Sequence, residues 1–171
     1  MLARLSELLR LTLDKTSVQQ VALRDDLEFV EKYLEIEGLR FGSRLRVRMA
    51  IAPETLDAAV PTLVLQPIVE NAIRHGIAPR VGGGTVEIRA SRENHRLVMV
   101  VKDDGPGLAR GKREALTSGV GISNTRSRLE HLYHGDYRFD FDEPVGGGLT
   151  VTISVPFAAA AEAAGSLEGV A

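Results

Sequence analysis

The sequence lacks several features that would point to particular classes of protein. It has no cysteine among its 171 residues, which excludes a disulfide scaffold and a thiolate zinc site. No apolar run approaches the roughly 20 residues that a membrane-spanning helix needs, and the N-terminus does not have the pattern of a signal peptide. We therefore expect no membrane segment in this chain.

The chain also has little net charge. Lys and Arg number 21 against 23 Asp and Glu, a formal net charge of −2 at pH 7. A protein whose main partner is nucleic acid usually carries a basic patch or a positive excess, so we expect no nucleic-acid partner. The apolar content of 44% is enough for one folded domain with its own core.

Two segments near the N-terminus have the spacing of amphipathic helices. Residues 2–15 repeat leucine at helical spacing, and residues 23–42 form a second pattern with a stop near Gly38 or Gly42. The leucines of the first segment suit a helix of a homodimer and packing on their own domain equally well. We expect a boundary between this helical part and the rest of the chain near residues 40–44.

The rest of the chain mixes strands with helices. Residues 44–51 alternate arginine with apolar residues, which predicts a half-buried strand whose arginines are a solvated face or a basic strip for an acidic partner. Pro61 is predicted to begin a helix that runs to residue 77. The remaining predicted elements are strands within 82–91, 96–105, 137–143 and 149–157, a loop at 105–121 and a helix at 122–135. This order predicts an α+β sandwich with helices over one face of the sheet, preceded by a separate helical segment.

The helix pattern in IVENAIRHG, residues 68–76, has two different faces. One side collects the apolar residues Ile68, Val69, Ala72 and Ile73. The other side collects polar residues of four kinds: Glu70, Asn71, Arg74 and His75. A core helix needs the apolar set alone, so the polar set needs another explanation.

Three glycine motifs follow in order along the chain. DDGPG at 103–107 comes after an apolar strand, GVGISN at 119–124 opens a helix, and GGG at 146–148 leads into the last strand. Each alone is ordinary turn, loop or hairpin chemistry. GVG also offers backbone N–H groups and a helix dipole, which suit a phosphate. The ordered set is more specific than its parts.

Together these motifs resemble the nucleotide-binding domain of the GHKL ATPases, a superfamily of sensor histidine kinases, type II topoisomerases, mismatch-repair ATPases and heat-shock chaperones. Residues 65–76 and 119–134 look most like the LytS-type sensor histidine kinases, and the likeness covers roughly residues 5–157. The resemblance implies a two-layer α/β sandwich with a mixed sheet. It also implies three parts: the end of a dimerisation region at 1–42, an ATP-binding catalytic domain at 43–157, and a low-complexity, disordered tail at 158–171.

The resemblance implies roles for individual residues. Asn71 would hold Mg²⁺ against the phosphates of ATP, which suits a metal that keeps most of its waters. Asp103 would accept a hydrogen bond from the exocyclic amine of adenine, where guanine offers no donor, so ATP is expected over GTP. The other implied nucleotide-binding residues are Arg74, His75, Gly105, Gly107, Gly119, Gly121, Ile122, Asn124 and Thr150.

Two departures from the family pattern stand near this site. Pro67 occupies the position where many relatives place an acid or amide, four residues before the magnesium asparagine. Glu70 is the nearby acid, and with Asn71 it makes the predicted catalytic pair, in a base or orienting role. Leu149 stands where a threonine is common, and we attach no loss of function to it. The stretch between Gly107 and Gly119 would be the family's ATP lid.

The phosphoacceptor histidine of such a kinase lies upstream, in a stretch resembling NPHFLFN. None of the four histidines of this chain lies in such a stretch. We therefore expect the sensor and the phosphoacceptor histidine outside this sequence, with residues 2–15 as the tail of the dimerisation helix downstream of that histidine. The implied partners are that helix and a response regulator, and the implied place is the cytoplasmic side of a membrane-anchored parent protein.

Three functions follow from these observations. The first is the catalytic domain of a two-component sensor kinase, moving the γ-phosphoryl group of ATP to a histidine and from there to a response regulator. The second is a GHKL ATPase that hydrolyses ATP to drive conformational change, which Pro67 disfavours because water activation needs an acid. The third is a regulatory module without catalysis or a dimerisation piece, disfavoured by the presence of Asn71, Asp103 and the glycines. Turnover of ATP by the isolated chain would favour the second, and failure to bind nucleotide the third.

Overall fold

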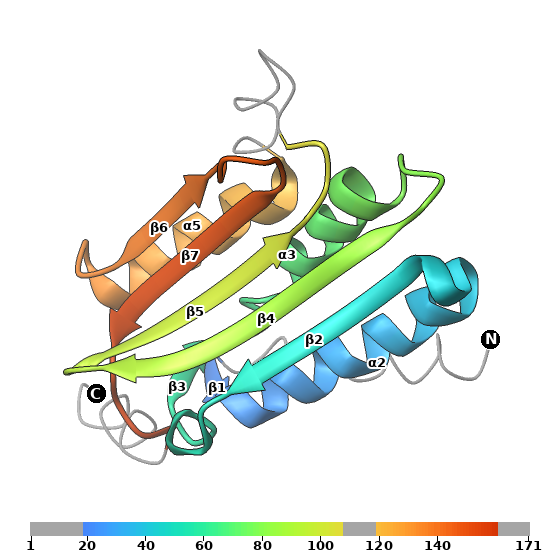
Figure 1. Ribbon diagram of the computed structural model, residues 1–171. Coiled ribbons are helices and arrows are strands. Elements are labelled where there is room, and N and C mark those ends of the chain that lie inside the picture. Colours follow the sequence, from blue (N-terminus) through green and yellow to red (C-terminus); the bar gives the residue numbers. More distant parts are fainter. Residues whose placement is uncertain (1–18, 108–118, 161–171) are drawn as a thin grey trace.

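The computed structural model describes residues 19–107 and 119–160. The predicted helix at 2–15, the lid and the tail from residue 161 lie outside these ranges. Five strands form one sheet in the order β2-β4-β5-β7-β6 (Figure 1). Their bounds are β2 Leu45–Ile51, β4 Gly84–Glu93, β5 Arg96–Asp103, β6 Arg138–Asp142 and β7 Leu149–Pro156.

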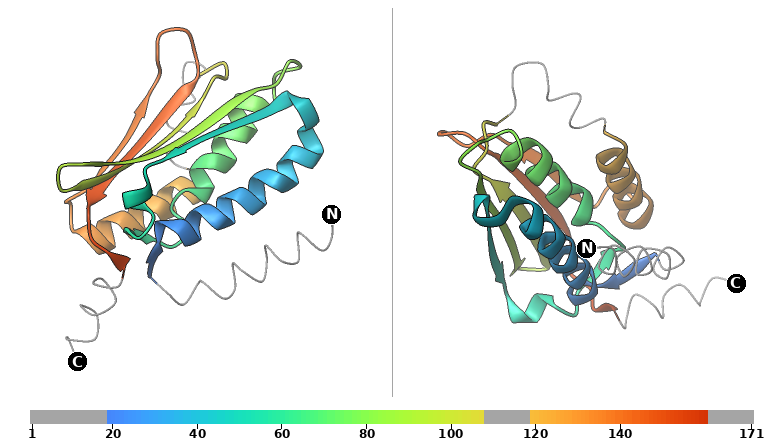
Figure 2. Two further views of the ribbon diagram at one scale, coloured as in Figure 1. Left: turned by 60° about the horizontal axis from the view of Figure 1, so that its bottom comes forward. Right: turned by 90° about the vertical axis from the view of Figure 1, so that its right-hand side faces the viewer.

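The sheet is mixed, and helices cover one of its faces. Strand β2 runs parallel to β4, while the other neighbouring strands are antiparallel. The helical layer, seen on one side of the sheet in Figure 2, contains α2 (Leu23–Phe41), α3 (Gln66–Asn71), the π-helix η3 (Ala72–Ile77) and α5 (Val120–Tyr133). The predicted α+β two-layer sandwich is confirmed.

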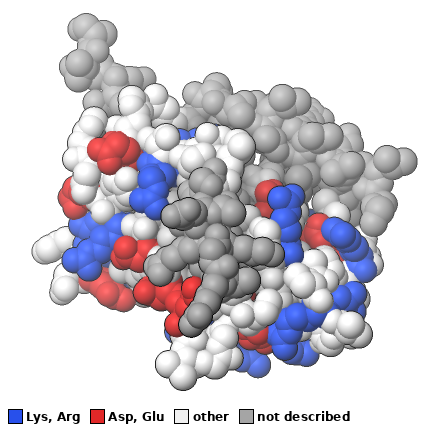
Figure 3. Space-filling model, turned by 90° about the horizontal axis from the view of Figure 1, so that it is seen from above, with Lys and Arg blue, Asp and Glu red and all other residues white. Residues whose placement is uncertain are grey.

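Short elements complete the described part of the chain. Strands β1 (Gln20–Ala22) and β3 (Ala59–Pro61) form a separate two-stranded antiparallel sheet. Single 3₁₀ turns, η1 (Gly42–Arg44) and η2 (Pro53–Thr55), flank β2. No helix of the described residues is long and apolar enough to cross a membrane. On the face shown in Figure 3, basic and acidic side chains are interspersed over the described surface.

Helix α2 packs into the same core as the sheet. Its Leu27 and Val30 belong to one buried cluster with Val86 and Ile88 of β4. The helix ends as predicted at Gly42, whose φ of 56° is the left-handed conformation that glycine adopts easily and whose N–H bonds the carbonyl of Gly38. The helix thus shares one core with the sheet, and the predicted domain division at residue 42 stays a prediction.

The predicted start of the next helix is wrong. Pro61 ends strand β3, where it pairs with Gln20, and α3 begins at Gln66 with Pro67 in its first turn. Both prolines fit a first helical turn, where a missing N–H costs nothing. Pairing with β1 keeps residues 59–61 extended, and Leu63 then takes a positive φ of 57° that interrupts any helix.

Two further expectations need correction. Strand β2 is not half-buried: Val47 and Met49 are 39% and 36% exposed, because β2 is an edge strand with a neighbour on one side alone. The first residues of the predicted disordered tail, from residue 158, pair with the fold. Ala158 accepts a hydrogen bond from Ala59, and Ala159 forms a β-bridge with Ala58.

Candidate functional site

A narrow pocket lies between α3, the first turn of α5 and the inner face of the sheet, at the end where β5 finishes and β7 begins. Asn71 and Asp103 are its polar lining residues. The apolar lining consists of Ile68, Ala72, Val101, Ile122, Phe141, Leu149 and Val151. Apolar walls with a few polar groups at fixed positions suit a flat ring that has polar edges.

Asp103 is the last residue of β5, and strand alternation turns its side chain inward, where it is 4% exposed. Its Oδ1 accepts the backbone N–H of Gly105 at 2.8 Å. Burial raises the pKa of the Asp103 carboxyl, against the opposing effect of backbone hydrogen bonds from Gly105 and Leu149. A buried carboxylate that keeps acceptor capacity beside an apolar cavity is suited to recognise an N–H donor.

The neighbouring carboxylate has a different role. Asp104 points away from the pocket, and its Oδ1 accepts the backbone N–H of Thr85 at 2.8 Å. The same oxygen lies 3.1 Å from Arg80 Nη1. Asp104 therefore ties the end of β5 to the start of β4, and Asp103 is the acid of this pair that faces the pocket.

Two glycines allow the backbone of their own segments to pack closely against the Asp103 side chain. A Cβ atom on Gly76 would lie 2.6 Å from Asp103 Cγ, and one on Gly105 would overlap the Cα atom of Gly76. Gly76 belongs to η3, where Ala78 N–H bonds Ile73 O at 2.8 Å across the wider turn of a π-helix. Sequence reasoning did not single out Gly76, because its partner lies 27 residues away (103 − 76).

Asp26 of α2 fixes the start of α3. This carboxylate is 1% exposed and accepts the backbone N–H groups of Val64 at 3.2 Å and Leu65 at 3.1 Å. Val64 and Leu65 directly precede α3, where a carboxylate satisfies backbone N–H groups and interacts well with the helix dipole. Arg128 of α5 donates to the carbonyl of Thr62 at 2.6 Å. The helix that carries Asn71 is thus held at its start by both neighbouring helices.

The glycine turn between β6 and β7 packs against the backbone of Asp103. Gly146, Gly147 and Gly148 all have positive φ, as the predicted hairpin connection requires. A Cβ atom on Gly148 would overlap the carbonyl oxygen of Asp103. Leu149 and Val151 then line the pocket, and strand alternation places Thr150 on the other face of the sheet. The structure therefore does not bring Thr150 to the pocket.

The start of α5 lies at the mouth of the pocket. Ile122 lines it and is 1% exposed, whereas Asn124 is exposed. Gly121 packs on α3, because a Cβ atom there would lie 3.1 Å from Pro67 Cβ. Gly119 precedes the helix and has no side chain to cap it, so among the described residues no side-chain cap occupies the first N–H groups of α5. Gly107, with a φ of 73°, is the last described residue before the lid.

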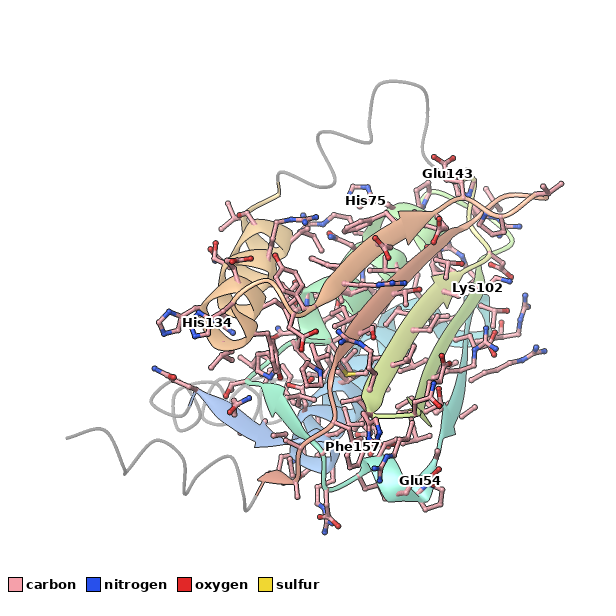
Figure 4. All side chains as sticks on the ribbon, turned by 90° about the vertical axis from the view of Figure 1, so that its left-hand side faces the viewer. Glu54, His75, Lys102, His134, Glu143 and Phe157 are labelled. Atoms are coloured by element: carbon pink, nitrogen blue, oxygen red, sulfur yellow. The ribbon has the colours of Figure 1, made fainter. Side chains whose placement is uncertain are left out.

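The polar face of the helix formed by α3 and η3 divides between two sites. Asn71 lines the pocket of Asp103, whereas Glu70 and Arg74 line a second groove toward α2. Glu70 accepts a hydrogen bond from Gln66 Nε2 at 2.6 Å. His75 is exposed and lies at the same end of the molecule as Glu143 (Figure 4).

The donor set at Asn71 fits magnesium. The described residues contain no group of three or more His, Asp or Glu side chains that would form a metal site by themselves. A single amide oxygen suits Mg²⁺, which is commonly held by one or two protein ligands with phosphate oxygens and water.

Comparison with known families agrees with this geometry. The family described as "Histidine kinase-, DNA gyrase B-, and HSP90-like ATPase" matches residues 57–159, which include all the lining residues of the pocket. The chain belongs to this ATPase family. A second family, described as "Histidine kinase", matches residues 1–45. The predicted GHKL membership and its LytS-like type are confirmed.

Relatives of this ATPase domain are sensor kinases. "Sensor histidine kinase BtsS" of Escherichia coli K12 is 40% identical over 137 residues, covering 80% of this chain and 24% of that protein. "Sensor protein LytS" of Bacillus anthracis is 28% identical over 165 residues, covering 91% and 28%. The chain thus spans about a quarter of the length of these curated relatives.

A solved structure has the same fold. The histidine kinase domain of the blue-light activated histidine kinase of Erythrobacter litoralis EL346 superposes with a TM-score of 0.66 at 20% identity. The match covers 91% of this chain and 74% of that one. It therefore includes nearly the whole described sandwich.

Proposed function

We propose that this domain transfers the γ-phosphoryl group of ATP to a histidine on an upstream dimerisation helix, for relay to a response regulator. The observation that carries the proposal is the placement of Asp103 and Asn71 in one apolar pocket of an ATPase-family domain. The domain would work on the cytoplasmic side of the membrane, where ATP is present. Its relatives BtsS and LytS are named as sensor proteins, which supports this assignment.

Binding of adenine is the first task of the pocket. The apolar walls would enclose the ring, and the Asp103 carboxylate would accept the hydrogen bond of the exocyclic amine. Gly76 and Gly105 allow the close approach that places this carboxylate. Guanine has a carbonyl oxygen where adenine has the amine, so two acceptors would face each other and GTP would bind poorly.

Binding of the phosphates is the second task. Asn71 would hold Mg²⁺, which when bound neutralises phosphate charge. The first N–H groups of α5, at Gly119 and Gly121, would donate to phosphate oxygens. Arg74 and His75 would add positive charge or donors beside them. Phosphoryl transfer depends mostly on such positioning and charge neutralisation.

ATP hydrolysis as the main activity has less support. Water activation would need an acid at position 67, but Pro67 packs there against Gly121. Glu70 is the nearest acid on the helix, and Gln66 holds it on the side of the α2 groove. We assign Glu70 an orienting role toward the phosphoacceptor.

The thermal midpoint with and without nucleotide tests this proposal. A ligand at about 100 times its dissociation constant adds roughly 2.7 kcal/mol, which raises the midpoint of a domain of this size by roughly 5 to 10 °C. We expect this shift with ATP and Mg²⁺, a smaller one with ATP alone, and none with GTP. Equal shifts with ATP and GTP would contradict the assignment of Asp103, and no shift with either nucleotide would contradict the proposed function.

A further inference from the structure

The five-stranded sheet has two edges that lie far from the pocket lining of α3 and α5. Strand β2 (Leu45–Ile51) forms one edge and strand β6 (Arg138–Asp142) forms the other, on opposite sides of the sheet (Figure 1). Among the described strands, each of these two pairs with one neighbour. The backbone N–H and C=O groups on the free side of such a strand can pair with a further strand. The sheet can therefore be extended at β2 and at β6.

Strand β2 has a basic face and an apolar face. Arg46 and Arg48 lie on the face of the sheet that points away from the helices. Val47 and Met49 lie on the helix-covered face, next to buried residues of β4. All four side chains are exposed. The edge thus presents alternating positive charge and apolar surface to a partner.

Strand β6 has the same alternation with the opposite charge. Asp140 and Asp142 are exposed on the face away from the helices, whereas Phe139 and Phe141 are buried on the helix-covered face. None of the ion pairs within residues 19–107 and 119–160 uses these two aspartates or Arg48. The charges of both edges are therefore available to a partner.

The strand directions allow the two edges to meet. Strand β2 runs parallel to β4, and each following neighbour reverses direction, so β6 runs antiparallel to β2. A second copy displaced sideways along the sheet, without being turned over, brings its own β6 antiparallel to β2. The helices of both copies then cover the same face. One sheet would continue from the first copy into the second.

A single antiparallel register matches the charges of the two edges. It gives two pairs of opposite charge on the face away from the helices, Arg46 with Asp142 and Arg48 with Asp140 of the second copy. Opposite charges directly across a strand pair are stabilising, and like charges are destabilising. The remaining charged residue of β6, Arg138, then lies opposite the small neutral side chain of Ala50.

The same register also joins the apolar faces. Val47 lies opposite Phe141 of the second copy, and Met49 lies opposite Phe139. Pairs of an aromatic with a β-branched side chain are among those that stabilise a strand pair. The contact would cover Val47 and Met49, the two apolar side chains that β2 leaves exposed.

Pairing of either edge with its own copy is disfavoured by charge. In an antiparallel pair of two β2 strands, arginines would face arginines, and in a pair of two β6 strands, aspartates would face aspartates. Charged side chains on an edge strand commonly prevent such self-pairing. In this chain they block each edge against itself and favour one edge against the other.

We propose that copies of this chain associate edge to edge, with β2 of one copy paired antiparallel to β6 of the next. The proposal goes beyond ATP binding and does not depend on it. The interface is head-to-tail, so each added copy leaves one edge unused and the association is open-ended. The copies share one orientation apart from the sheet twist, and neighbouring catalytic domains are thereby held in a row.

Sedimentation velocity between about 10 µM and about 1 mM chain tests the association, because so small an interface implies a dissociation constant on the order of 100 µM. We expect the mean mass to rise with concentration past that of two copies and to fall at high salt. A dimer made by residues 2–15 would stop at two copies. Reversal of one edge, Arg46→Glu with Arg48→Glu, should weaken association at least about 10-fold.

Reversal of the other edge, Asp140→Arg with Asp142→Arg, should weaken association equally. A mixture of the two reversed variants should associate again, because the acidic β2 of one variant meets the basic β6 of the other and the two unchanged edges also match. The matched control is Arg89→Glu with Arg92→Glu. Both arginines are exposed on β4, which has a neighbour on each side, so this change of equal charge should leave association unchanged.

A cysteine pair tests the register, because the chain has no cysteine of its own. Arg48→Cys mixed with Asp140→Cys should form a disulfide-linked pair of copies on mild oxidation, and Arg89→Cys mixed with Asp140→Cys should not. Equal cross-linking in the two mixtures, or none in either, would overturn the register.

Three sedimentation results would overturn the proposal: a monomer at every concentration, association that survives either reversal, or a mixture of reversed variants that stays monomeric. Arg46→Gln with Arg48→Gln, which removes the charge without reversing it, should weaken association less than the glutamates do. A normal midpoint shift with Mg·ATP in each variant would show that the domain is folded and that the proposed function stands apart from this inference.

Discussion

The backbone of Gly76 lies directly against the side chain of Asp103: a Cβ atom at Gly76 would be 2.6 Å from Asp103 Cγ. This contact joins the π-helix η3 to the end of strand β5. Gly76 packs against the same Asp103 Oδ1 that accepts the hydrogen bond from Gly105. Neither residue can change size without moving the other.

Substitution of Gly76 should therefore damage both the fold and nucleotide binding. Overpacking a buried contact costs about 1 to 3 kcal/mol, so we expect Gly76→Ala to lower the free energy of unfolding by that amount and to abolish the midpoint shift with Mg·ATP. Urea unfolding and thermal shift measure the two effects. The control is Gly38→Ala, with nothing within 4 Å of its Cβ, which should stabilise α2 by about 0.5 to 1 kcal/mol. Normal ATP binding by Gly76→Ala would show that Asp103 can move freely.

Asp103→Asn should separate stability from binding. Because burial raises the pKa of the Asp103 carboxyl in the folded state, the folded chain binds this proton more tightly than the unfolded chain. The associated stabilisation is present at low pH and is lost as pH rises through the folded-state pKa. Asparagine does not ionise, so we expect the variant to gain stability relative to the unsubstituted chain as pH rises.

Unfolding of both chains between pH 3 and pH 8 measures this difference, because the range begins below the ordinary Asp pKa of about 3.9. ATP binding should be lost, because an amide nitrogen or a reoriented oxygen cannot replace the carboxylate. A constant stability difference over the whole pH range would contradict a raised pKa for Asp103.

Removal of the Asp26 carboxylate should destabilise the domain strongly. Hydrogen bonds to a charged group contribute roughly 1.5 to 3 kcal/mol each, and Asp26→Ala loses two while leaving the N–H groups of Val64 and Leu65 buried. We expect a loss of about 3 kcal/mol or more in the free energy of unfolding. Asp25→Ala, in the same first turn of α2, should cost under about 1 kcal/mol. Equal losses in the two variants would remove the special role of Asp26.

Asn71→Ala should remove the contribution of Mg²⁺ to ATP affinity and leave the other contributions to that affinity in place. We expect the affinity for ATP in the absence of Mg²⁺ to stay near that of the unsubstituted chain, and the increase on adding Mg²⁺ to disappear. Calorimetric titration with and without excess chelator separates the two affinities. An undiminished response to Mg²⁺ would place the metal on another residue.

The parts of the fold with strong local patterns were predictable from the sequence. Helix α2, the β4–β5 and β6–β7 pairs and helix α5 all have apolar residues at clear periods over eight or more positions or between clear turn signals. Strands β1 and β3 have three residues each, too few for any period to appear. The prediction that this helix begins at Pro61 was wrong, because two prolines six residues apart both fit a first helical turn.

The site was predictable in part for the same reason. The inward direction of Asp103 follows from strand alternation, and the same rule would have placed Leu149 rather than Thr150 in the pocket. Some contacts join residues that are distant in sequence. Asp26 contacts Leu65, Gly76 contacts Asp103, and Glu37 lines the same groove as Glu70. Such contacts depend on the packing of helices against the sheet, which no local pattern encodes.

The parallel pairing of β2 with β4 also bears on the order of folding. Strands β4 and β5 are joined by a tight turn at Asn94, so this hairpin can form early, whereas β2 must wait for the chain that contains α3 to close a long loop. The pocket needs residues from Ile68 to Val151, and we expect it to appear after the rate-limiting step. ATP should then slow unfolding while leaving the refolding rate unchanged.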